Sequence, residues 1–264
     1  MSDTDTASAV TVQKLPDHIA LVTINRPEAR NAVNGAVARG LEAAIDATDA
    51  DDDVWVVVLT GAGADAFSAG ADLKAVSGGL GHELRTERGG FAGFVHAAKK
   101  KPWIAAVNGP ALAGGCEIAL ACDLIVAVPA ARFGLPEVKR GLIASAGGLY
   151  RLPRALPPAI AREMILTGEP ISAERAHQLG MVNVLTTDAA GLLPAAQALA
   201  ARITVNAPVA VRESLAVARR AQDGTDAQLR QASEEGQARN MQSEDYQEGP
   251  RAFIEKRAPR WSGR

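Results

Sequence analysis

The chain has 264 residues, of which 47% are hydrophobic and 22% are charged, a composition typical of a folded globular protein and not of a disordered one. Its formal net charge of −2 argues against nucleic acid as the main partner, because nucleic-acid-binding domains usually carry a basic surface. Two cysteines are too few for a disulfide framework, and no apolar run is long enough to predict a membrane span.

The first ten residues are polar and acidic, and we expect residues 1–10 to form a disordered tail. This segment lacks the basic start and the apolar stretch of a signal peptide. Together with the small number of cysteines, this favours a reducing compartment, so a cytoplasmic location is expected.

Short apolar runs separated by turn residues predict four strands in the first half of the chain. They are expected at residues 19–24, 54–60, 103–107 and 124–128. The runs at 54–60 and 103–107 are apolar nearly throughout, which is typical of strands buried on both faces of a sheet. Helical spacing predicts helices over 31–49, about 91–99 and from 114 to about 122. This alternation is typical of layered α/β folds.

The second half of the chain is predicted to be mainly helical. Before it, the glycine-rich stretch 75–90 is expected to form a mobile loop or a broken helix. After residue 151 the strand signal largely stops. Helices are expected at about 157–166, 172–178, 190–203, 208–222 and 225–239, followed by a last stretch at 243–256. This helical tail is interpreted either as a separate layer or as a surface used for oligomerisation.

Two glutamates each stand beside a glycine-containing turn. Glu117 ends the run Gly-Gly-Cys-Glu at 114–117, and Glu137 ends Phe-Gly-Leu-Pro-Glu at 133–137. A third turn of small residues lies upstream at 67–74. Small residues let main-chain N–H groups approach a ligand closely, and two such turns can place two donors around one developing oxyanion. Two nearby carboxyl groups can act on one water as base and acid, so acid–base chemistry beside a polarised carbonyl is indicated.

Other chemistries find less support in the sequence. Taken singly, each glutamate is also typical of a solvated surface position. The four histidines show no metal-ligand spacing, so no metal site is expected. The turn at 61–63 follows a strand but lacks the rest of the dinucleotide-binding fingerprint.

The three motifs, in this order and spacing, resemble those of the enoyl-CoA hydratase/isomerase (crotonase) superfamily, and most of all an enoyl-CoA hydratase. They lie at 68–74, 105–117 and 133–137, and the resemblance runs from about residue 24 to 257. It implies an α/β fold in which a spiral of ββα turns over 11–200 holds the active site. A helical region over 201–264 would serve trimer assembly, giving a homotrimer or a homohexamer.

The resemblance also implies a ligand and a reaction. The ligand would be an acyl-CoA thioester, with coenzyme A as part of the substrate and no separate cofactor. Ala71 and Gly114 would supply the two oxyanion-hole N–H groups, and Glu117 and Glu137 match the two catalytic glutamates of hydratases. The implied reaction of lipid metabolism is reversible syn addition of water to a 2-enoyl-CoA to give a 3-hydroxyacyl-CoA. We assign Glu117 as the base and Glu137 as the acid that protonates the α-carbon.

Further residues are candidates for contact with the substrate or its coenzyme A. Arg26 and Arg30 lie where relatives often contact coenzyme A, although ordinary surface charge explains them equally well. Asp72 either takes part in binding or only fixes its turn by accepting backbone N–H groups. Lys74 either contacts the adenine or a phosphate or is solvated. The remaining candidates belong to the same turns and are Ala69, Ala71, Leu73 and Gly114.

Three other functions stay compatible with the sequence. They are double-bond isomerisation, dehydration of a hydroxyacyl-CoA such as carnitinyl-CoA, and a non-catalytic role in binding an acyl-CoA or a protein. The presence of both glutamates weakens the isomerase and binding hypotheses, but it does not separate hydratase from dehydratase because hydration is reversible. The stretch 141–146 departs from the Pro and Gly that many relatives carry near their acyl pocket, so the size of the acyl group stays open.

Overall fold

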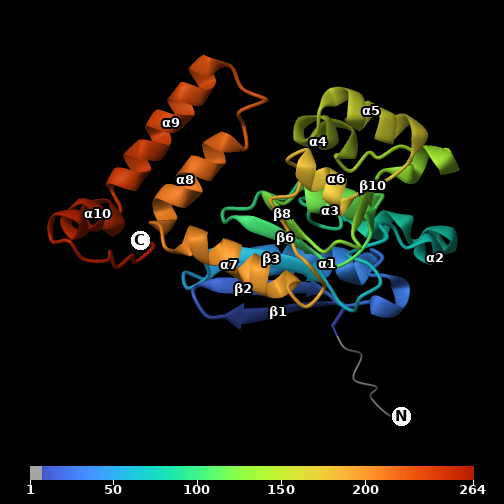
Figure 1. Cartoon of the computed structure of the whole chain (residues 1–264), viewed down its shortest axis with the longest axis horizontal. Coiled ribbons are helices and arrows are strands. Elements are labelled where there is room, and N and C mark those ends of the chain that lie inside the picture. The colour runs from blue at the N-terminus through green and yellow to red at the C-terminus, as the bar shows by residue number, and fades with distance from the viewer. Residues whose placement is uncertain (1–7) are drawn as a thin grey trace, which may run out of the picture.

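The computed structural model describes residues 8–264, and a mostly parallel six-stranded sheet lies at its centre (Figure 1). The strand order is β1-β2-β3-β6-β8-β11, and only β1 and β2 pair antiparallel. The strands are β1 (Val10–Leu15), β2 (Ile19–Ile24), β3 (Val56–Gly61), β6 (Trp103–Val107), β8 (Leu124–Ala127) and β11 (Val184–Leu185). All residues of β3 and β6 are buried, which confirms that these runs are central strands.

A second, smaller sheet carries the turns that matter for the site. Its order is β10 (Ile171–Ser172), β9 (Arg132–Gly134) and β7 (Ala111–Leu112), with β7 and β9 parallel. A separate hairpin pairs β4 (Arg85–Thr86) with β5 (Gly90–Phe91). The pairing of β7 with β9 places the predicted glycine turn at 114–117 beside the one at 133–137.

Ten α-helices are described in residues 8–264, and α7 lies along the central sheet and packs on β3 and β6 (Figure 1). They are α1 (Gly35–Ala50), α2 (Leu73–Ala75), α3 (Gly114–Leu120), α4 (Gly148–Ala155), α5 (Pro158–Thr167), α6 (Ala173–Gln178), α7 (Leu192–Thr204), α8 (Pro208–Ala218), α9 (Asp226–Met241) and α10 (Glu244–Ile254). Five begin at a polar side chain that accepts a backbone N–H, as helix N-caps commonly do: Asn34, Asp72, Ser172, Thr225 and Ser243. No helix of residues 8–264 combines the length and hydropathy that a bilayer crossing requires.

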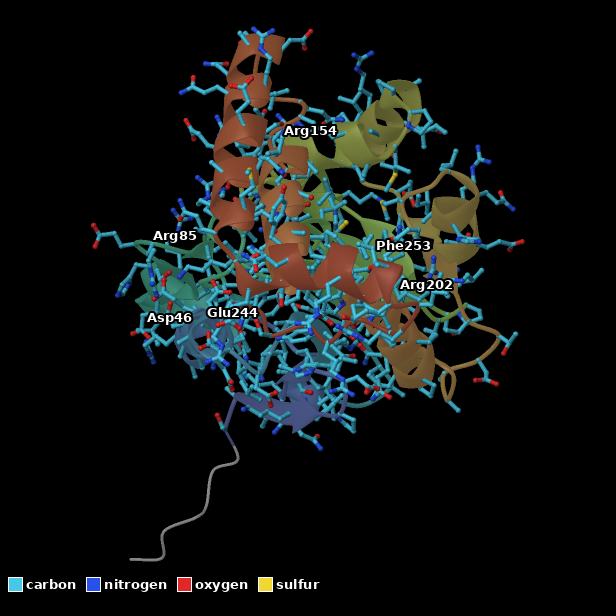
Figure 2. All side chains as sticks on the ribbon, turned by 90° about the vertical axis from the view of Figure 1, so that its left-hand side faces the viewer. Asp46, Arg85, Arg154, Arg202, Glu244 and Phe253 are labelled. Atoms are coloured by element: carbon cyan, nitrogen blue, oxygen red, sulfur yellow. The ribbon has the colours of Figure 1, made fainter. Side chains whose placement is uncertain are left out.

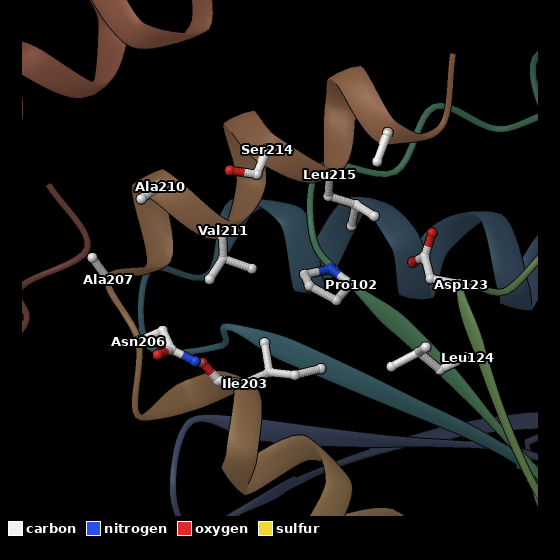
Figure 3. Close-up of a pocket in the computed structure, with 11 residues that line it drawn as sticks. Pro102, Asp123, Leu124, Ile203, Asn206, Ala207, Ala210, Val211, Ser214 and Leu215 are labelled. Atoms are coloured by element: carbon white, nitrogen blue, oxygen red, sulfur yellow. Dashed lines mark hydrogen bonds between the residues drawn. The ribbon is translucent and has the colours of Figure 1, made fainter. Parts of the chain in front are cut away.

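Helices α8, α9 and α10 form an arm at the left of Figure 1 that extends away from the sheet, and the turn between α8 and α9 reaches α4 through the ion pair of Asp223 with Arg154. On α10, Phe253 and Ile254 are 85% and 79% exposed, and Figure 2 views the molecule with this helix in front. Between α8 and the sheet lies an apolar groove of about 520 Å³ (Figure 3). Its lining includes Pro102, Leu124, Ile203, Val211 and Leu215. The boundary expected at residue 200 falls inside α7, which packs on the core.

The strand predictions at 19–24 and 103–107 are confirmed with their bounds, and the other two shift by two residues or fewer. The helix expected at 91–99 is wrong. Ala92 and Gly93 have φ values of 58° and 62°, which no right-handed helix accepts, so this segment folds into turns. Strand β1 and helix α4 were not expected. Of the predicted tail, residues 1–7 lie outside the described residues, and Val10 already belongs to β1.

The stretch 75–90 is a broken helix followed by the β4–β5 hairpin. After α2 come the short helices η2 (Val76–Leu80) and η3 (Gly81–Leu84), and two more single-turn helices are η1 (Pro27–Ala29) and η4 (Pro136–Arg140). Gly79 interrupts the helical path with a φ of 82°, a value that glycine adopts without strain.

Candidate active site

The three small-residue turns found in the sequence lie side by side in the fold. Ser68 forms a parallel bridge with Ala111, and the Leu112 N–H donates to the Ser68 carbonyl at 3.2 Å. One residue further on, the Ala113 N–H donates to the Gly134 carbonyl at 2.9 Å. The turns at 67–74 and 133–137 therefore flank the central turn at 110–117.

Two glycines make this close approach possible. A Cβ on Gly70, whose φ is +85°, would lie 2.8 Å from the Gly114 nitrogen. A Cβ on Gly115 would lie only 2.0 Å from the Ser68 carbonyl oxygen. Both distances are shorter than any real Cβ contact, so only glycine lets these two backbones touch. The contact sets the amide of Gly114 next to the residue that precedes Ala71.

Two N–H groups at this contact are left without an acceptor. Among residues 8–264, neither the Ala71 nor the Gly114 amide donates a hydrogen bond. Their neighbours are engaged: the Gly70 N–H donates to Ser68 Oγ at 3.2 Å, and the Asp72 N–H donates to the Val33 carbonyl at 2.9 Å. Because buried backbone donors are nearly always paired, two unengaged amides at one contact are suited to receive an oxygen of a ligand.

The peptide that carries the Gly114 N–H is held in an unusual conformation. Ala113 has φ 51° and ψ −128°, a region that side chains other than hydrogen disfavour. Its N–H is fixed by the Gly134 carbonyl, and its own carbonyl accepts from the Glu117 N–H at 3.1 Å. The surrounding structure thus imposes the strain that orients this amide.

We expect Ala113→Gly to stabilise the protein by about 1 kcal/mol and to keep activity, because glycine adopts the same dihedral angles without strain. Denaturant unfolding of both proteins measures this difference. A clear loss of stability in the glycine variant would show that the Ala113 methyl group contributes packing that outweighs its strain.

Glu117 is a buried carboxylic acid on α3, with 3% of its surface exposed. Its Oε1 accepts the N–H of Gly148, the first residue of α4, at 2.9 Å. Burial raises its pKa to about 7, although the Gly148 N–H favours the ionised form. A Cβ on Gly148 would lie 3.1 Å from Glu117 Cγ, so a glycine lets α4 approach this closely.

Glu137 lies in the first turn of η4 and carries a buried oxygen with no partner. Its Oε2 is buried and accepts no hydrogen bond from residues 8–264. Burial raises the pKa of Glu137, and its negative charge in turn raises that of Glu117. The two carboxyl groups therefore interact, and the orphan oxygen is a ready acceptor for a water or a substrate group.

Arg26 and Asp72 are bonded to each other. Arg26 Nη1 donates to Asp72 Oδ2 at 3.0 Å and to the Ala32 carbonyl at 2.7 Å. Asp72 also accepts the N–H groups of Lys74 and Ala75 and so caps α2. Although burial opposes ionisation, these donors hold the pKa of Asp72 below its ordinary value. Both residues thus fix the turn of Ala71, and their contact with coenzyme A stays a prediction.

The remaining candidates form a rim of exposed residues beside the same turn. Arg30, Ala69, Leu73 and Lys74 are all exposed. The Ala69 N–H donates to the Arg30 carbonyl at 3.0 Å, which connects the Arg30 loop to the turn. Their place is compatible with substrate contact, which stays a prediction.

Three residues near the glutamates and the free amides were missed by the sequence reasoning. A Cβ on Gly114 would lie 2.4 Å from Phe91 Cε1, so the phenyl ring covers the Gly114 backbone. Gly148 supplies the N–H to Glu117, and Arg151 on the same helix lies close enough to lower the Glu117 pKa. The glycine pair at 147–148 ahead of a helix was the one available signal.

Comparison with known proteins gives a consistent result. The family described as enoyl-CoA hydratase/isomerase matches residues 14–264. A carnitinyl-CoA dehydratase from Salmonella typhi is 40% identical over 249 residues, covering 92% of this chain and 94% of that protein. The crystal structure of an enoyl-CoA hydratase from Mycobacterium marinum has 48% identity and a TM-score of 0.92, covering 97% of this chain and all (100%) of that one. The crystal structure of a carnitinyl-CoA hydratase from Mycobacterium avium has 48% identity and a TM-score of 0.78, and the match covers 98% of this chain and 100% of that one.

Proposed function

The chain belongs to the enoyl-CoA hydratase/isomerase (crotonase) family of enzymes, which act on acyl-CoA thioesters, and we propose that it is an enoyl-CoA hydratase. The reaction would be reversible syn addition of water to a 2-enoyl-CoA to give a 3-hydroxyacyl-CoA. The observation that carries the proposal is a set of three adjoining turns that holds the carboxyl groups of Glu117 and Glu137 together with two unengaged amides.

The two amides would act on the thioester carbonyl. As water attacks the β-carbon, electrons move toward the thioester oxygen, which gains negative charge in an enolate-like transition state. The N–H groups of Ala71 and Gly114 would donate to that oxygen. One such donor is typically worth roughly 3–4 kcal/mol of barrier. The contact at Gly70 fixes both donors before the substrate arrives, so little reorganisation is needed.

The two carboxyl groups would hold and activate the water. An ionised Glu117 takes one proton from the water as its oxygen bonds to the β-carbon, and a protonated Glu137 gives a proton to the α-carbon. After one turnover Glu117 carries the proton and Glu137 is ionised, and proton exchange between the pair or with solvent restores the starting state. The raised pKa of both groups suits this exchange near neutral pH.

We expect kcat/KM to fall as the pH decreases through about 7, because the base Glu117 becomes protonated there. The two carboxyl groups interact, so the inflection belongs to the pair and not to one residue. A pH profile of the hydration rate measures it. A rate that stays constant from neutral pH down to the ordinary range of a glutamate would contradict an ionised Glu117 as the base.

The direct test of the function is loss of the conjugated enoyl-thioester absorbance with crotonyl-CoA and with a longer 2-enoyl-CoA. We expect fast loss and a 3-hydroxyacyl-CoA product. The longer substrate is included because exposed apolar side chains lie in the turn of Ala71 (Leu73) and after the turn of Glu137 (Leu142 and Ile143). No loss with either substrate would rule out a general hydratase.

Dehydration of a carnitinyl-CoA-like substrate is the second candidate, because relatives with 40% and 48% identity carry that substrate in their names. Its acyl group bears a trimethylammonium cation. The positive charge of Arg151 acts on Glu117, and it would also repel such a cation near the water site. Comparing kcat/KM for crotonyl-CoA and for its trimethylammonium analogue separates the two: a preference for the analogue would favour the dehydratase.

The assembly and the cofactor requirement are also proposals. We infer a homotrimer or homohexamer built through the C-terminal arm, supported by the exposed Phe253 and Ile254 and by the apolar groove beside α8. Light scattering on the purified protein measures the mass. The reaction is proposed to use no cofactor other than the coenzyme A of the substrate, and treatment with a chelator tests this. A cytoplasmic location likewise stays an expectation.

A further inference from the structure

Arg151 is a partly buried arginine whose guanidinium group binds main-chain carbonyls and no carboxylate. Its Nη2 donates to the Val95 carbonyl at 2.6 Å, and its Nη1 donates to the Ala146 carbonyl at 3.3 Å. Within residues 8–264 it forms no ion pair, whereas the comparable Arg219 pairs with Asp123 at 2.7 Å. A partly buried cation without a counter-ion is costly, so its position calls for an explanation.

The two carbonyls that Arg151 binds belong to the two segments that complete the site. Ala146 precedes the Gly147-Gly148 turn, whose Gly148 N–H donates to Glu117. Val95 belongs to the turn after β5, and the Val95 N–H donates to the carbonyl of Phe91, whose ring covers Gly114. One guanidinium group thus connects the turn that hydrogen-bonds Glu117 with the turn whose Phe91 ring covers Gly114.

Among the described residues, Glu117 is the carboxylic acid on which the positive charge of Arg151 acts. The ionisable groups that act on Glu117 are Glu137 and Arg151, and of these only Arg151 favours the ionised carboxylate. On its other sides Arg151 faces groups that are not carboxylic acids: Tyr150, Arg154, Cys122, His96 and Lys99. The cation is therefore placed to stabilise the negative charge of Glu117.

The backbone beside Arg151 is shaped to admit the guanidinium group. Gly147 has a φ of +110°, and a Cβ there would lie 1.9 Å from Arg151 Nη1. Any other residue at 147 would displace the guanidinium, so the glycine pair serves both contacts: Gly147 makes room for Arg151, and Gly148 reaches Glu117.

We propose that Arg151 is a positioning residue of the hydration reaction: its planar guanidinium group connects the Gly148 turn to the Phe91 turn, and its charge stabilises the carboxylate of Glu117. The inference rests on the proposed function for its kinetic part only. Two properties of the side chain are involved, geometry and charge. Arg151→Lys keeps the charge and loses the planar group, whereas Arg151→Gln loses both.

The test compares Arg151→Gln, Arg151→Lys and the control Arg154→Gln, which lies on the same helix and pairs with Asp223 on the surface. We expect Arg151→Gln to lower kcat about 10-fold to 100-fold, with a small change in KM, because the catalytic groups are displaced. The acidic limb of its pH profile should move to higher pH, because a charge that favours the ionised form of Glu117 is lost. Arg151→Lys should keep the wild-type pH profile but show a reduced kcat, and the control should match the wild type.

A second readout is independent of activity. Carbon-13 NMR of labelled glutamate carboxyl groups, with Glu117→Gln to assign the signal, follows the Glu117 titration without substrate. A higher pKa of Glu117 in Arg151→Gln, reversed in Arg151→Lys, supports the electrostatic part even if the wild type does not hydrate enoyl-CoA. An unchanged titration overturns that part, and a wild-type kcat in Arg151→Lys overturns the geometric part. If Arg151→Gln does not fold, Arg151→Lys still decides the geometric part.

Discussion

Glu117→Gln and Glu137→Gln are each expected to lower turnover by roughly 100-fold to 10,000-fold, while binding of an acyl-CoA survives. Glutamine keeps the shape of each side chain but neither takes nor gives a proton. At position 117 its carbonyl oxygen can still accept the Gly148 N–H, so the turn of α4 stays in place. The double variant should be little slower than the slower single variant, because the two groups act on one water.

Stability measurements on the same variants distinguish a loss of catalysis from a loss of folding stability. The pKa of Glu117 is raised from 4.5 to about 7 in the folded protein, so the folded state disfavours the ionised carboxylate. The wild type therefore loses stability as the pH rises from about 4.5 to 7. Each pH unit between the two values corresponds to about 1.4 kcal/mol, which makes the ionised group unfavourable by roughly 3 kcal/mol.

Glu117→Gln should consequently be more stable than the wild type above pH 7, by up to roughly 3 kcal/mol, and the gain should vanish below about pH 4.5. Denaturant unfolding at the two pH extremes measures it. An inactive but more stable variant is the signature of a catalytic carboxylate. Unchanged turnover in both single variants would remove the two-glutamate mechanism.

Gly115→Ala is expected to lose most activity and to destabilise the protein by about 3 kcal/mol or more, because its Cβ would lie 2.0 Å from the Ser68 carbonyl oxygen. Neither backbone can move without separating the turns of Ala71 and Gly114. A displacement of about 1 Å in such a site typically reduces the rate about 100-fold. Turnover and denaturant unfolding on the same preparation measure both effects.

Gly78→Ala is the matched control for this substitution. A Cβ at Gly78 meets nothing within 4 Å, and the residue lies in η2, close in sequence to the turn of Ala71. We expect it to keep wild-type turnover and stability. Wild-type behaviour in Gly115→Ala as well would mean that the two turns are not held at the separation described.

Much of this fold could be predicted because its central elements have local signals. The apolar runs of β3 and β6 are long enough to identify buried strands, and the spacing of apolar residues in α1 identifies a helix. The segment at 91–99 misled the same reasoning. Its apolar residues recur as in a helix, but Gly93 packs against the Ala38 carbonyl, where a Cβ would lie 2.1 Å away. That contact is tertiary and leaves no local pattern.

The candidate site could likewise be predicted from the sequence only in part. Its turns could be found because glycine is needed wherever two backbones touch, as at Gly70 and Gly115. The partners of Glu117 could not be found, because Gly148 and Arg151 reach it from a helix about 30 residues further along the chain. Pro153 also hid that helix, since proline in a helical pattern usually indicates its end.

Hydration itself is tested by the mass of the product formed from crotonyl-CoA in water labelled with oxygen-18. A hydratase should give a 3-hydroxyacyl-CoA that carries the heavy oxygen, and Glu117→Gln should slow its formation by the factor given above. A consumed substrate whose product has no oxygen from water would contradict hydration and point to isomerisation. Complete absence of turnover, with the acyl-CoA still bound, would contradict the proposed reaction and favour a binding role.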